Sequence, residues 1–568
     1  MLYSKRYLLM TAVVAVSAFL LVRETGKQNI QVGTFRGRDL ESEVWNPLIA
    51  DSVNEKNIEL TIDNNHYTSE EVGIYMDQNL NLMIPVQILR DGLNCSAHIY
   101  GGEELLVEKY NDEISYRLGE TTVSVNDEAQ TVESGLIQKN GRFYVSIQSL
   151  AEEMGYSYQW DIESNTANAG NERKDSSTVP SQFTLRGKGR TGVVKDQGSY
   201  GTCWAFAALS AMESTLLPEQ SVQFSPDHMS LMNSFSLTQK DGGDYTMGMA
   251  YLAAWQGPVY EEDDPYDQEA VEGLTACMHV QESQLLPSKD FEQIKKAVFQ
   301  YGGVQTSIYN DLKNASDVSS YYNKEKNAYC YIGTEKPNHD VVIVGWDDLY
   351  PKENFTEELE GDGAFLCQNS WGEKFGDDGY FYISYYDTNI GIHNVVYTKI
   401  EEPDNYDHIY QSDLCGWVGQ LGFGQESAYG ANIYKATGNE SLEAVSFYAT
   451  GRDTEYQIYV VENYENVNDL SKFGTTYASG TLSNAGYYTI PLTAPVSLKE
   501  GERFAIVIKL TTPDAVRPLA IEYAADETTK NADIDDGEGY ISVNGLFWEN
   551  LESAYGCNLC LKAFTTEE

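Results

Sequence analysis

A cysteine, a histidine and an asparagine stand at the ends of predicted helices and strands, where side chains can perform nucleophilic chemistry. Cys203 opens the apolar run CWAFAALSAM after the turn-rich segment DQGSYGT. His339 precedes a β-branched strand in NHDVVIVGWDD, and Asn369 ends another short strand in FLCQNSWGE. A thiol nucleophile needs a base, a group that orients the base, and donors for an oxyanion. These residue types therefore indicate an acyl-transfer site.

The cysteine is expected at the beginning of a buried helix. Thr202 is a candidate N-cap, and the residues after Cys203 are apolar on every side, so the helix body should be buried and its tip exposed. The positive end of the helix dipole favours an anion, which predicts a lowered pKa for the Cys203 thiol. The alternative is a structural thiol, because free cysteine is among the most buried residue types.

Short strands must position the histidine and the asparagine. The patterns predict three of them, at 341–346, 364–368 and 379–386. Joined as an antiparallel sheet, they bring His339 and Asn369 together. The acidic segment 348–363 enlarges the turn between the first two strands. It either overhangs the site or, as we expect, forms a solvated loop.

Three motifs in order, QGSYGTCWAF, NHDVVIVGWDD and NSWGEKFGDDGYFYI, resemble the signatures of the papain-like cysteine peptidases. The resemblance covers about residues 179–400. It implies a papain-like fold, with a helical subdomain and an antiparallel β-barrel subdomain, and it implies peptide-bond hydrolysis. His339 follows Cys203 by 136 residues, within the roughly 130–150 residues typical of this family.

The resemblance also assigns roles to the matched residues. It makes Cys203 the nucleophile, His339 the general base and then acid, and Asn369 the group that holds the imidazole. Gln197 matches the position whose side-chain amide joins the Cys203 backbone N–H in the oxyanion hole. Substrate binding is assigned to four residues: Gly242, Gly243, Trp371 and Trp204. The glycines let a substrate strand pair along the site, and the first of the tryptophans shields the hydrogen bond between Asn369 and His339.

The cysteines depart from the family pattern. Where the family has a disulfide, this sequence has Tyr200 and, opposite it, Lys240 or Asp241. The sequence therefore lacks both cysteines of this structural disulfide, so neither of them is left unpaired. The eight cysteines are scattered along a long chain and do not form a disulfide scaffold. Cys557 and Cys560, in CNLC, are expected to be two thiols of a strand.

Metal and nucleic-acid chemistry are not indicated. The sequence lacks a His-Glu-x-x-His motif, and the pair Cys277 and His279 is too small a set for a metal site. We predict neither a metal nor a cofactor. With 38 Lys and Arg against 86 Asp and Glu, the net charge is −48. Such a surface repels phosphate backbones and anionic lipid, so nucleic acid is not an expected partner.

The first residues, 1–27, indicate export. A basic start precedes an apolar run at residues 7–22, which is typical of a signal peptide and short for a membrane-spanning helix. A cleaved signal and a retained signal anchor both fit. We predict a secreted protein or one on the extracytoplasmic cell surface, with membrane contact only through such an anchor.

Two similar segments, 79–100 and 139–161, each predict a strand, a short amphipathic helix and a second strand. The second copy resembles the copper amine oxidase N-terminal-like domain, a stalk module whose name implies no copper chemistry. We therefore predict a small α+β repeat domain at 57–169. A polar linker follows at 170–180, where the exposed basic pair at 173–174 predicts a cleavage that releases a mature form.

From 404 to 568, short strands alternate with turn signals, which predicts a β-sandwich. This block resembles the lectin-like domain found downstream of papain-like peptidases in exported bacterial proteins. Trp417, Phe423 and Tyr429 are candidates for stacking on sugar rings, which motivates the hypothesis of a cell-surface glycan partner.

Together these observations predict a multidomain α+β protein, with a peptidase domain at 181–400 between the repeat domain and the sandwich. The predicted function is an exported thiol endopeptidase that acts on proteins or peptides. The alternative is a surface adhesion or glycan-binding protein that uses an inactive peptidase fold as a scaffold.

Overall fold

The computed structural model describes residues 58–171 and 179–567, except 64, 78, 110, 111, 152, 153, 155, 162, 163, 268, 313, 535 and 536. The predicted signal or anchor at 1–27 and most of the predicted linker lie outside these residues. Among the described residues, no helix combines the length and the apolar character that a membrane crossing requires.

The N-terminal region is built on the predicted repeat. Its two copies have matching elements: β4 (Leu82–Pro85), α4 (Val86–Asp91) and β5 (Ser96–Tyr100), then β11 (Arg142–Ser146), α5 (Ile147–Ala151) and β12 (Tyr156–Asp161). Strands β4 and β11 pair antiparallel, so the two copies join through equivalent strands. Leu89 of one helix and Leu150 of the other are both fully buried in the shared core. Each copy thus covers an apolar face that it could not bury alone.

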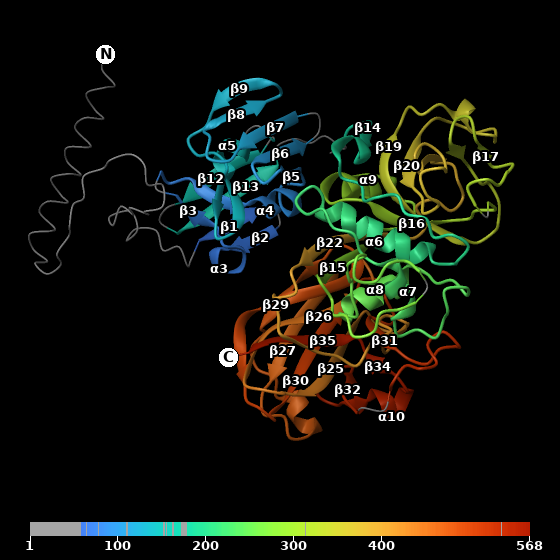
Figure 1. Cartoon of the computed structure of the whole chain (residues 1–568). Helices are drawn as coiled ribbons and strands as arrows, with labels where there is room; N and C mark the ends of the chain where they lie inside the picture. Colours follow the sequence, from blue (N-terminus) through green and yellow to red (C-terminus); the bar gives the residue numbers. More distant parts are fainter. Residues whose placement is uncertain are drawn as a thin grey trace, which may run out of the picture. The chain divides into compact units, whose positions relative to one another are not determined.

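Helices α6 (Cys203–Leu216) and α8 (Tyr245–Ala253) pack together behind the predicted site. Alanine and other small or apolar residues favour the first helix, and it is buried from Cys203 to Thr215. Asp244 caps the second helix by accepting a hydrogen bond from the Thr246 backbone N–H. Figure 1 shows both helices beside the strands β15 (His279–Leu285) and β22 (Asn394–Glu401).

The strands that hold the histidine and the asparagine belong to one antiparallel sheet. They are β16 (Val304–Ile308), β19 (His339–Asp347), β20 (Ala364–Gln368) and β21 (Tyr380–Ser384). Strand β19 lies between β16 and β20, and β21 pairs with the far edge of β20. The three predicted strands are therefore confirmed: the second has the predicted bounds, and the ends of the other two are shifted by one or two residues.

The C-terminal region continues this sheet. Strand β15 pairs with β22 on one side and with β29 (Ala485–Leu498) on the other, and β26 (Glu440–Ala449) and β35 (Leu561–Glu567) follow (Figure 1). Where β29 meets β15, a Cβ on Gly486 would collide with the Ser283 backbone oxygen. A glycine is therefore needed at this close approach.

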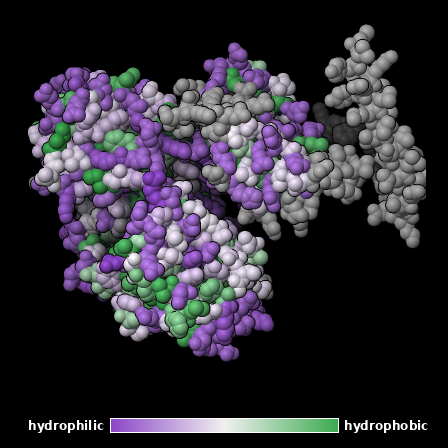
Figure 2. All heavy atoms as spheres, turned by 180° about the vertical axis from the view of Figure 1, so that it is seen from behind, coloured by the Kyte–Doolittle hydropathy of each residue, from purple (hydrophilic) through white to green (hydrophobic). Residues whose placement is uncertain are grey.

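A second sheet covers the C-terminal part of the first. Its longest strands are β25 (Ser427–Lys435), β27 (Thr454–Val461) and β30 (Arg503–Thr511), which pair antiparallel. Apolar residues of both sheets form one core, including Phe447 from the first and Ile508 from the second. This is the predicted sandwich architecture. Hydrophilic residues cover most of the face in Figure 2, with a group of hydrophobic ones on this C-terminal region.

The segment 348–363 differs from the expected solvated loop. Tyr350, Phe355 and Leu359 are each less than one tenth exposed and form a small core with Cys330. Tyr350 also stacks on Tyr382 of β21, with ring centroids 4.1 Å apart. Acidic residues dominate the composition of this segment, so its sequence indicates a solvated loop. The burial of these three apolar side chains instead attaches the segment to the sheet.

Candidate active site

Cys203 is the first residue of α6 and is 9 % exposed. The predicted cap differs in detail, because the Thr202 side chain makes no capping hydrogen bond. Its hydroxyl instead lies 2.7 Å from the hydroxyl of Tyr266. The helix tip is thus held by a side-chain contact with a neighbouring loop, and the thiol remains at the end of a buried helix.

His339 and Asn369 are joined across the sheet. His339 begins β19, and Asn369 follows the last residue of β20. The distance between His339 Nε2 and Asn369 Oδ1 is 2.8 Å, and the same oxygen accepts the Ser370 backbone N–H at 2.9 Å. With Nε2–H donating to the amide, the neutral ring keeps Nδ1 as an acceptor. The asparagine therefore fixes both the tautomer and the orientation of the ring.

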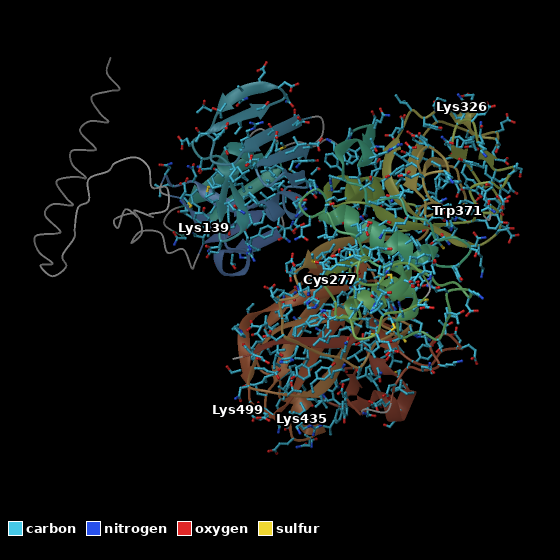
Figure 3. The ribbon with its side chains drawn as sticks, in the orientation of Figure 1. Lys139, Cys277, Lys326, Trp371, Lys435 and Lys499 are labelled. Carbon is cyan, nitrogen blue, oxygen red and sulfur yellow. The ribbon has the colours of Figure 1, made fainter. Side chains whose placement is uncertain are left out.

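Trp371 covers this pair. Its ring centroid lies 5.0 Å from that of His339, and the side chain is 8 % exposed. It packs edge-on against Phe375. Figure 3 labels Trp371 among the side chains of the sheet region. The indole thus reduces the access of water to the imidazole.

Gln197 is fixed to the same loop as the asparagine. Its backbone N–H donates to the Ser370 carbonyl at 2.9 Å, and Ser370 Oγ donates to Gln197 Oε1 at 2.6 Å. Gln197 Nε2 donates one hydrogen to the Tyr200 carbonyl at 2.7 Å. An amide nitrogen carries two hydrogens, so one more is left to donate. Sequence reasoning missed Ser370, although it stands inside the Asn-Ser-Trp-Gly motif.

Two backbone segments touch where the family has a disulfide. The Gly201 N–H donates to the Gln239 carbonyl at 2.8 Å, and a Cβ on Gly201 would come within 2.8 Å of Gly242 Cα. A Cβ on Gly243 would collide with the Trp204 indole. Trp204 was expected to contact substrate. It is 2 % exposed and lies beneath that glycine, so it supports the backbone from inside.

Burial controls the charge of the cysteine and the histidine. It raises the pKa of Cys203 to about 12, with a smaller contribution from the Asp340 carboxylate, and it lowers the pKa of His339 to about 4. The predicted lowering of the thiol pKa by the helix dipole is therefore wrong, because desolvation outweighs the dipole. Burial therefore disfavours an isolated charge on either group.

Family comparisons agree with this geometry. Residues 179–400 match the family model described as papain family cysteine protease. Residues 179–400 are a papain-like cysteine peptidase domain. Cathepsin S from Bos taurus is 30 % identical over 215 residues, which cover 36 % of this chain and 59 % of that relative. Cathepsin S from Rattus norvegicus is 31 % identical over 219 residues, which cover 36 % of this chain and 60 % of that relative. The chain thus spans about three fifths of these relatives' length.

Two solved structures resemble the peptidase domain together with the region that follows it. Clostridial Cwp84 after propeptide cleavage is 28 % identical, with a TM-score of 0.61, and the match covers 68 % of this chain and 99 % of that one. The cysteine protease and lectin-like domains of Cwp84, a surface layer associated protein of Clostridium difficile, are 28 % identical, with a TM-score of 0.60. This match covers 70 % of this chain and 90 % of that one. The predicted papain-like fold with a C-terminal all-β region is confirmed.

The flanking regions match two further family models, described as copper amine oxidase N-terminal domain, residues 61–168, and lectin like domain, residues 409–565. Within the described residues, no group of three or more His, Cys, Asp or Glu side chains could hold a metal ion. His279, two residues after Cys277 and the first residue of β15, stacks on Trp255 with ring centroids 3.6 Å apart, and its Nδ1 lies 2.6 Å from Asn405 Oδ1. These contacts indicate a structural role for His279.

The remaining cysteines and aromatics have structural settings. All eight cysteines are free, and Cys557 and Cys560 flank the two-residue strand β34 (Asn558–Leu559). Phe423 and Tyr429, two of the three aromatics proposed for sugar stacking, pack against the cores of the sandwich. Trp417 also packs against a core, and in addition it lines a surface pocket of about 560 Å³ together with Tyr523 and Tyr555.

Proposed function

We propose that this chain is an exported thiol endopeptidase that hydrolyses peptide bonds through Cys203, His339 and Asn369. The arrangement of two of these residues is the main support for the proposal. The His339 ring is held by Asn369 at 2.8 Å, and the backbone of the next residue, Asp340, interacts with Cys203 at the tip of a buried helix. A structural role for all three residues would need neither the oriented imidazole nor the thiol at the helix tip.

The first half of the reaction begins from the neutral pair. The Cys203 proton moves to His339 Nδ1 as Sγ forms a bond to the substrate carbonyl carbon, and the carbonyl π electrons move to its oxygen. Proton transfer creates both charges at once, and each then offsets the desolvation of the other. When the C–N bond breaks, Nδ1–H gives its proton to the leaving amine. The product of this half is an acyl group on Cys203.

The second half regenerates the enzyme. His339 Nδ1 takes a proton from water as the water oxygen bonds to the acyl carbon. The C–S bond then breaks, and the thiolate takes the proton back from the imidazolium. Throughout, Asn369 keeps the ring in place through Nε2–H, which stays protonated in every step.

The oxyanion is assigned to Gln197 and to the Cys203 backbone N–H. One Nε2 hydrogen of Gln197 is used by the Tyr200 carbonyl, so the second is the proposed donor. The Ser370 hydroxyl anchors the other end of the amide. A donor fixed before the reaction costs no reorganisation when the charge develops, which favours this assignment.

Gly242 and Gly243 are the proposed backbone partners of an extended substrate. Gly242 has a φ of 88°, and any Cβ on Gly243 would collide with Trp204. A glycine pair leaves the backbone groups open to a substrate strand, which is a form of β-augmentation. Trp371 contributes by covering the histidine and asparagine pair.

The domain division and location belong to the same proposal. It places a signal or anchor at 1–27, the repeat domain at 57–169, a linker at 170–180, the peptidase domain at 181–400 and the sandwich at 404–568. The similarity to Cwp84, described as a surface layer associated protein, supports a secreted or surface location.

We also propose that cleavage in the linker releases a mature form, because a basic pair lies there. N-terminal sequencing of the secreted protein is expected to give a start between residues 174 and 181. A start near residues 19–27 in every secreted species would contradict this proposal.

A second function, glycan attachment through the C-terminal region, is favoured by one pocket. Its lining includes the aromatic rings of Trp417, Tyr523 and Tyr555, together with Arg517, which has no ion pair among the described residues. Aromatic faces next to polar donors suit pyranose rings. Binding of the full chain to a glycan array, lost in Trp417→Ala with Tyr523→Ala, supports this function, and an array without any bound glycan contradicts it.

The peptidase proposal is tested with the full chain and its Cys203→Ala variant under reducing conditions. A mixed fluorogenic peptide library measures turnover, and a thiol-reactive epoxide labels the active site. Turnover and labelling in the parent alone support a peptidase. If neither protein shows turnover or labelling although circular dichroism shows that both are folded, the scaffold-only alternative is favoured.

A further inference from the structure

One face of the N-terminal region, residues 58–171, is buried although it lies outside that region's own core. Side chains alternate between the two faces of a strand such as β5. Ala97 and Ile99 of this strand lie in the core of the region. Ser96 and His98 therefore point the other way, yet they are only 1 % and 2 % exposed. Another part of the chain must cover the outer face of β5.

The peptidase domain covers this face, and the two regions belong to one compact unit. Helix α9 (Phe291–Gln300) packs against β5. Because β5 is the edge strand of its sheet, its outer N–H groups have no strand partner. Glu219, which follows α6, accepts the Ile99 backbone N–H at 3.1 Å, and its Oε1 lies 3.4 Å from His98 Nδ1. Burial lowers the pKa of His98 to about 3, so this ring is neutral in the contact.

Side-chain hydrogen bonds extend the contact to the end of α9. Gln300 Nε2 donates to Asn94 Oδ1 at 3.2 Å, and the Tyr301 hydroxyl donates to Asp91 Oδ1 at 3.2 Å. Gln300 is 4 % exposed, so its amide is enclosed. These bonds join α9 to the residues at the end of α4 and just after it. The contact is therefore specific as well as buried.

An ion pair and a buried arginine complete the contact. Lys188 Nζ lies 2.7 Å from Glu108 Oε1, with side chains 25 % and 16 % exposed. Arg190 is fully buried and donates from Nη2 to the Tyr301 carbonyl at 2.5 Å. This bond holds the segment that carries Lys188 against the end of α9.

All of these contacts lie away from the catalytic residues. Cys203 begins α6 and Glu219 follows its other end, and a helix of 14 residues separates its two ends by about 20 Å. In the sheet, His339 pairs with Ile308, the last residue of β16. Tyr301 stands before the first residue of that strand. The N-terminal region therefore binds at the ends of α6 and β16 that are opposite to the site.

We propose that the N-terminal region stays bound to the peptidase domain after the linker is cut, so that the mature enzyme is a non-covalent complex of two fragments. The inference rests on the proposed cleavage of the linker and goes beyond it, because it says what becomes of the fragment that is cut off. It also assigns this fragment a docking role, since it binds away from the site. The cut should therefore leave kcat/KM unchanged.

The test uses the full chain with residues 172–178 replaced by the recognition sequence of a site-specific protease. Cys203→Ala is included to prevent self-digestion. After the cut, size-exclusion chromatography at about 1 µM should show both fragments in one peak, because a complex tighter than this does not separate. Native mass spectrometry should give the sum of the two masses. Separate peaks would overturn the proposal.

Charge reversal identifies the surface that holds the fragments together. Glu108→Lys places like charges together and should weaken binding about tenfold, and adding Lys188→Glu should restore it. Glu128→Lys makes the same charge change on the exposed strand β9 (Glu128–Thr131) and is the matched control. His98→Glu places a second carboxylate beside Glu219 on the buried face and should weaken binding about 100-fold. Equal binding in the parent and all of these variants would overturn the proposed surface.

Failure of this proposal and failure of the proposed function give different results. The engineered cut does not depend on natural cleavage, and binding is measured without an active nucleophile. With Cys203 restored, turnover per epoxide-titrated site should be the same before and after the cut. A severalfold rise would overturn the docking role, because it would mean that the N-terminal region restrains the site. Absence of both labelling and turnover in the uncut chain removes the peptidase proposal, and the chromatography still decides whether the fragments stay bound.

Discussion

Two clusters of buried polar side chains differ in whether they contain an ion pair. The site cluster contains Cys203, His339 and Asn369; burial raises the pKa of the thiol and lowers that of the imidazole, and the Asn369 Nδ2 has no partner among the described residues. The junction cluster, near the C-terminus, contains an ion pair in which Lys562 Nζ lies 2.8 Å from Asp413 Oδ1, with both side chains almost fully buried.

The junction cluster is held by several of its own contacts, although Asp413 Oδ2 and Asn558 Oδ1 lack a hydrogen-bond partner among the described residues. Glu522 accepts hydrogen bonds from the Cys415 backbone N–H at 2.6 Å and from Asn558 Nδ2 at 2.8 Å. Lys562 also donates to Gln411 Oε1 at 2.9 Å. The clusters therefore differ in what they contain: the junction cluster has a buried ion pair, which contributes to stability, whereas the site cluster has an imidazole and a thiol arranged for proton transfer. Each prediction below separates these two behaviours.

The largest expected effect is on stability, at the junction cluster. Lys562→Met leaves the Asp413 carboxylate buried without its counter-ion, which should lower the free energy of unfolding by about 3–5 kcal/mol. Urea unfolding measures this change. The turnover per epoxide-titrated site should stay near the parent value at 25 °C. Equal losses of stability and of turnover per site would contradict the division between the clusters.

The next effect is on catalysis. Gln197→Ala removes the proposed oxyanion donor and should lower kcat by about 100- to 1000-fold, with a small change in KM. Ser370→Ala removes only the anchor of that amide and should cost less, about 5- to 10-fold. Steady-state kinetics with one fluorogenic peptide measures both. A Ser370→Ala loss as large as that of Gln197→Ala would mean that loop geometry, not the donor, is responsible.

A smaller catalytic effect is expected at the asparagine. Asn369→Ala frees the imidazole and should lower kcat by about 10- to 100-fold, because a displaced ring is no longer aligned with the thiol. Asn369→Asp keeps an acceptor for Nε2–H and should retain more activity. If both variants were as active as the parent, the 2.8 Å hydrogen bond would have no role in orienting the His339 imidazole.

The smallest effect is a pH dependence of labelling at Cys203. Burial raises the pKa of Asp340 to about 6, so the carboxyl is neutral below that pH and charged above it. The charged carboxylate raises the pKa of the Cys203 thiol, so Asp340→Asn should speed epoxide labelling of Cys203 more at pH 7 than at pH 5. A ratio of variant to parent labelling rates that is the same at both pH values would contradict this expectation.

Local patterns in the sequence were sufficient for much of the site. Cys203, His339 and Asn369 each stand at the end of a helix or strand whose apolar pattern is strong, so their elements could be predicted from nearby residues. The repeat in the N-terminal region was predictable for the same reason, since each copy has the same order of strand and helix. The sandwich strands were also predicted, because turn residues separate them.

Features that depend on distant contacts could not be predicted. The pairing of β15 with β29 joins residues about 200 positions apart, which no local pattern encodes. The raised pKa of Cys203 comes from desolvation by the surrounding fold, whereas sequence reasoning counted only the helix dipole.

The central claim, that Cys203 is the nucleophile, is tested most directly by mapping one covalent adduct. The full chain is treated with a limiting amount of a thiol-reactive epoxide and analysed by peptide mass spectrometry. Cys277 is the natural competitor, because it is the one half-buried cysteine while Cys203 is 9 % exposed, and Figure 3 shows it apart from Trp371 of the site. We expect an adduct on Cys203 alone, lost in His339→Ala. An adduct on Cys277 first, or on Cys203 with equal rate in His339→Ala, would contradict it.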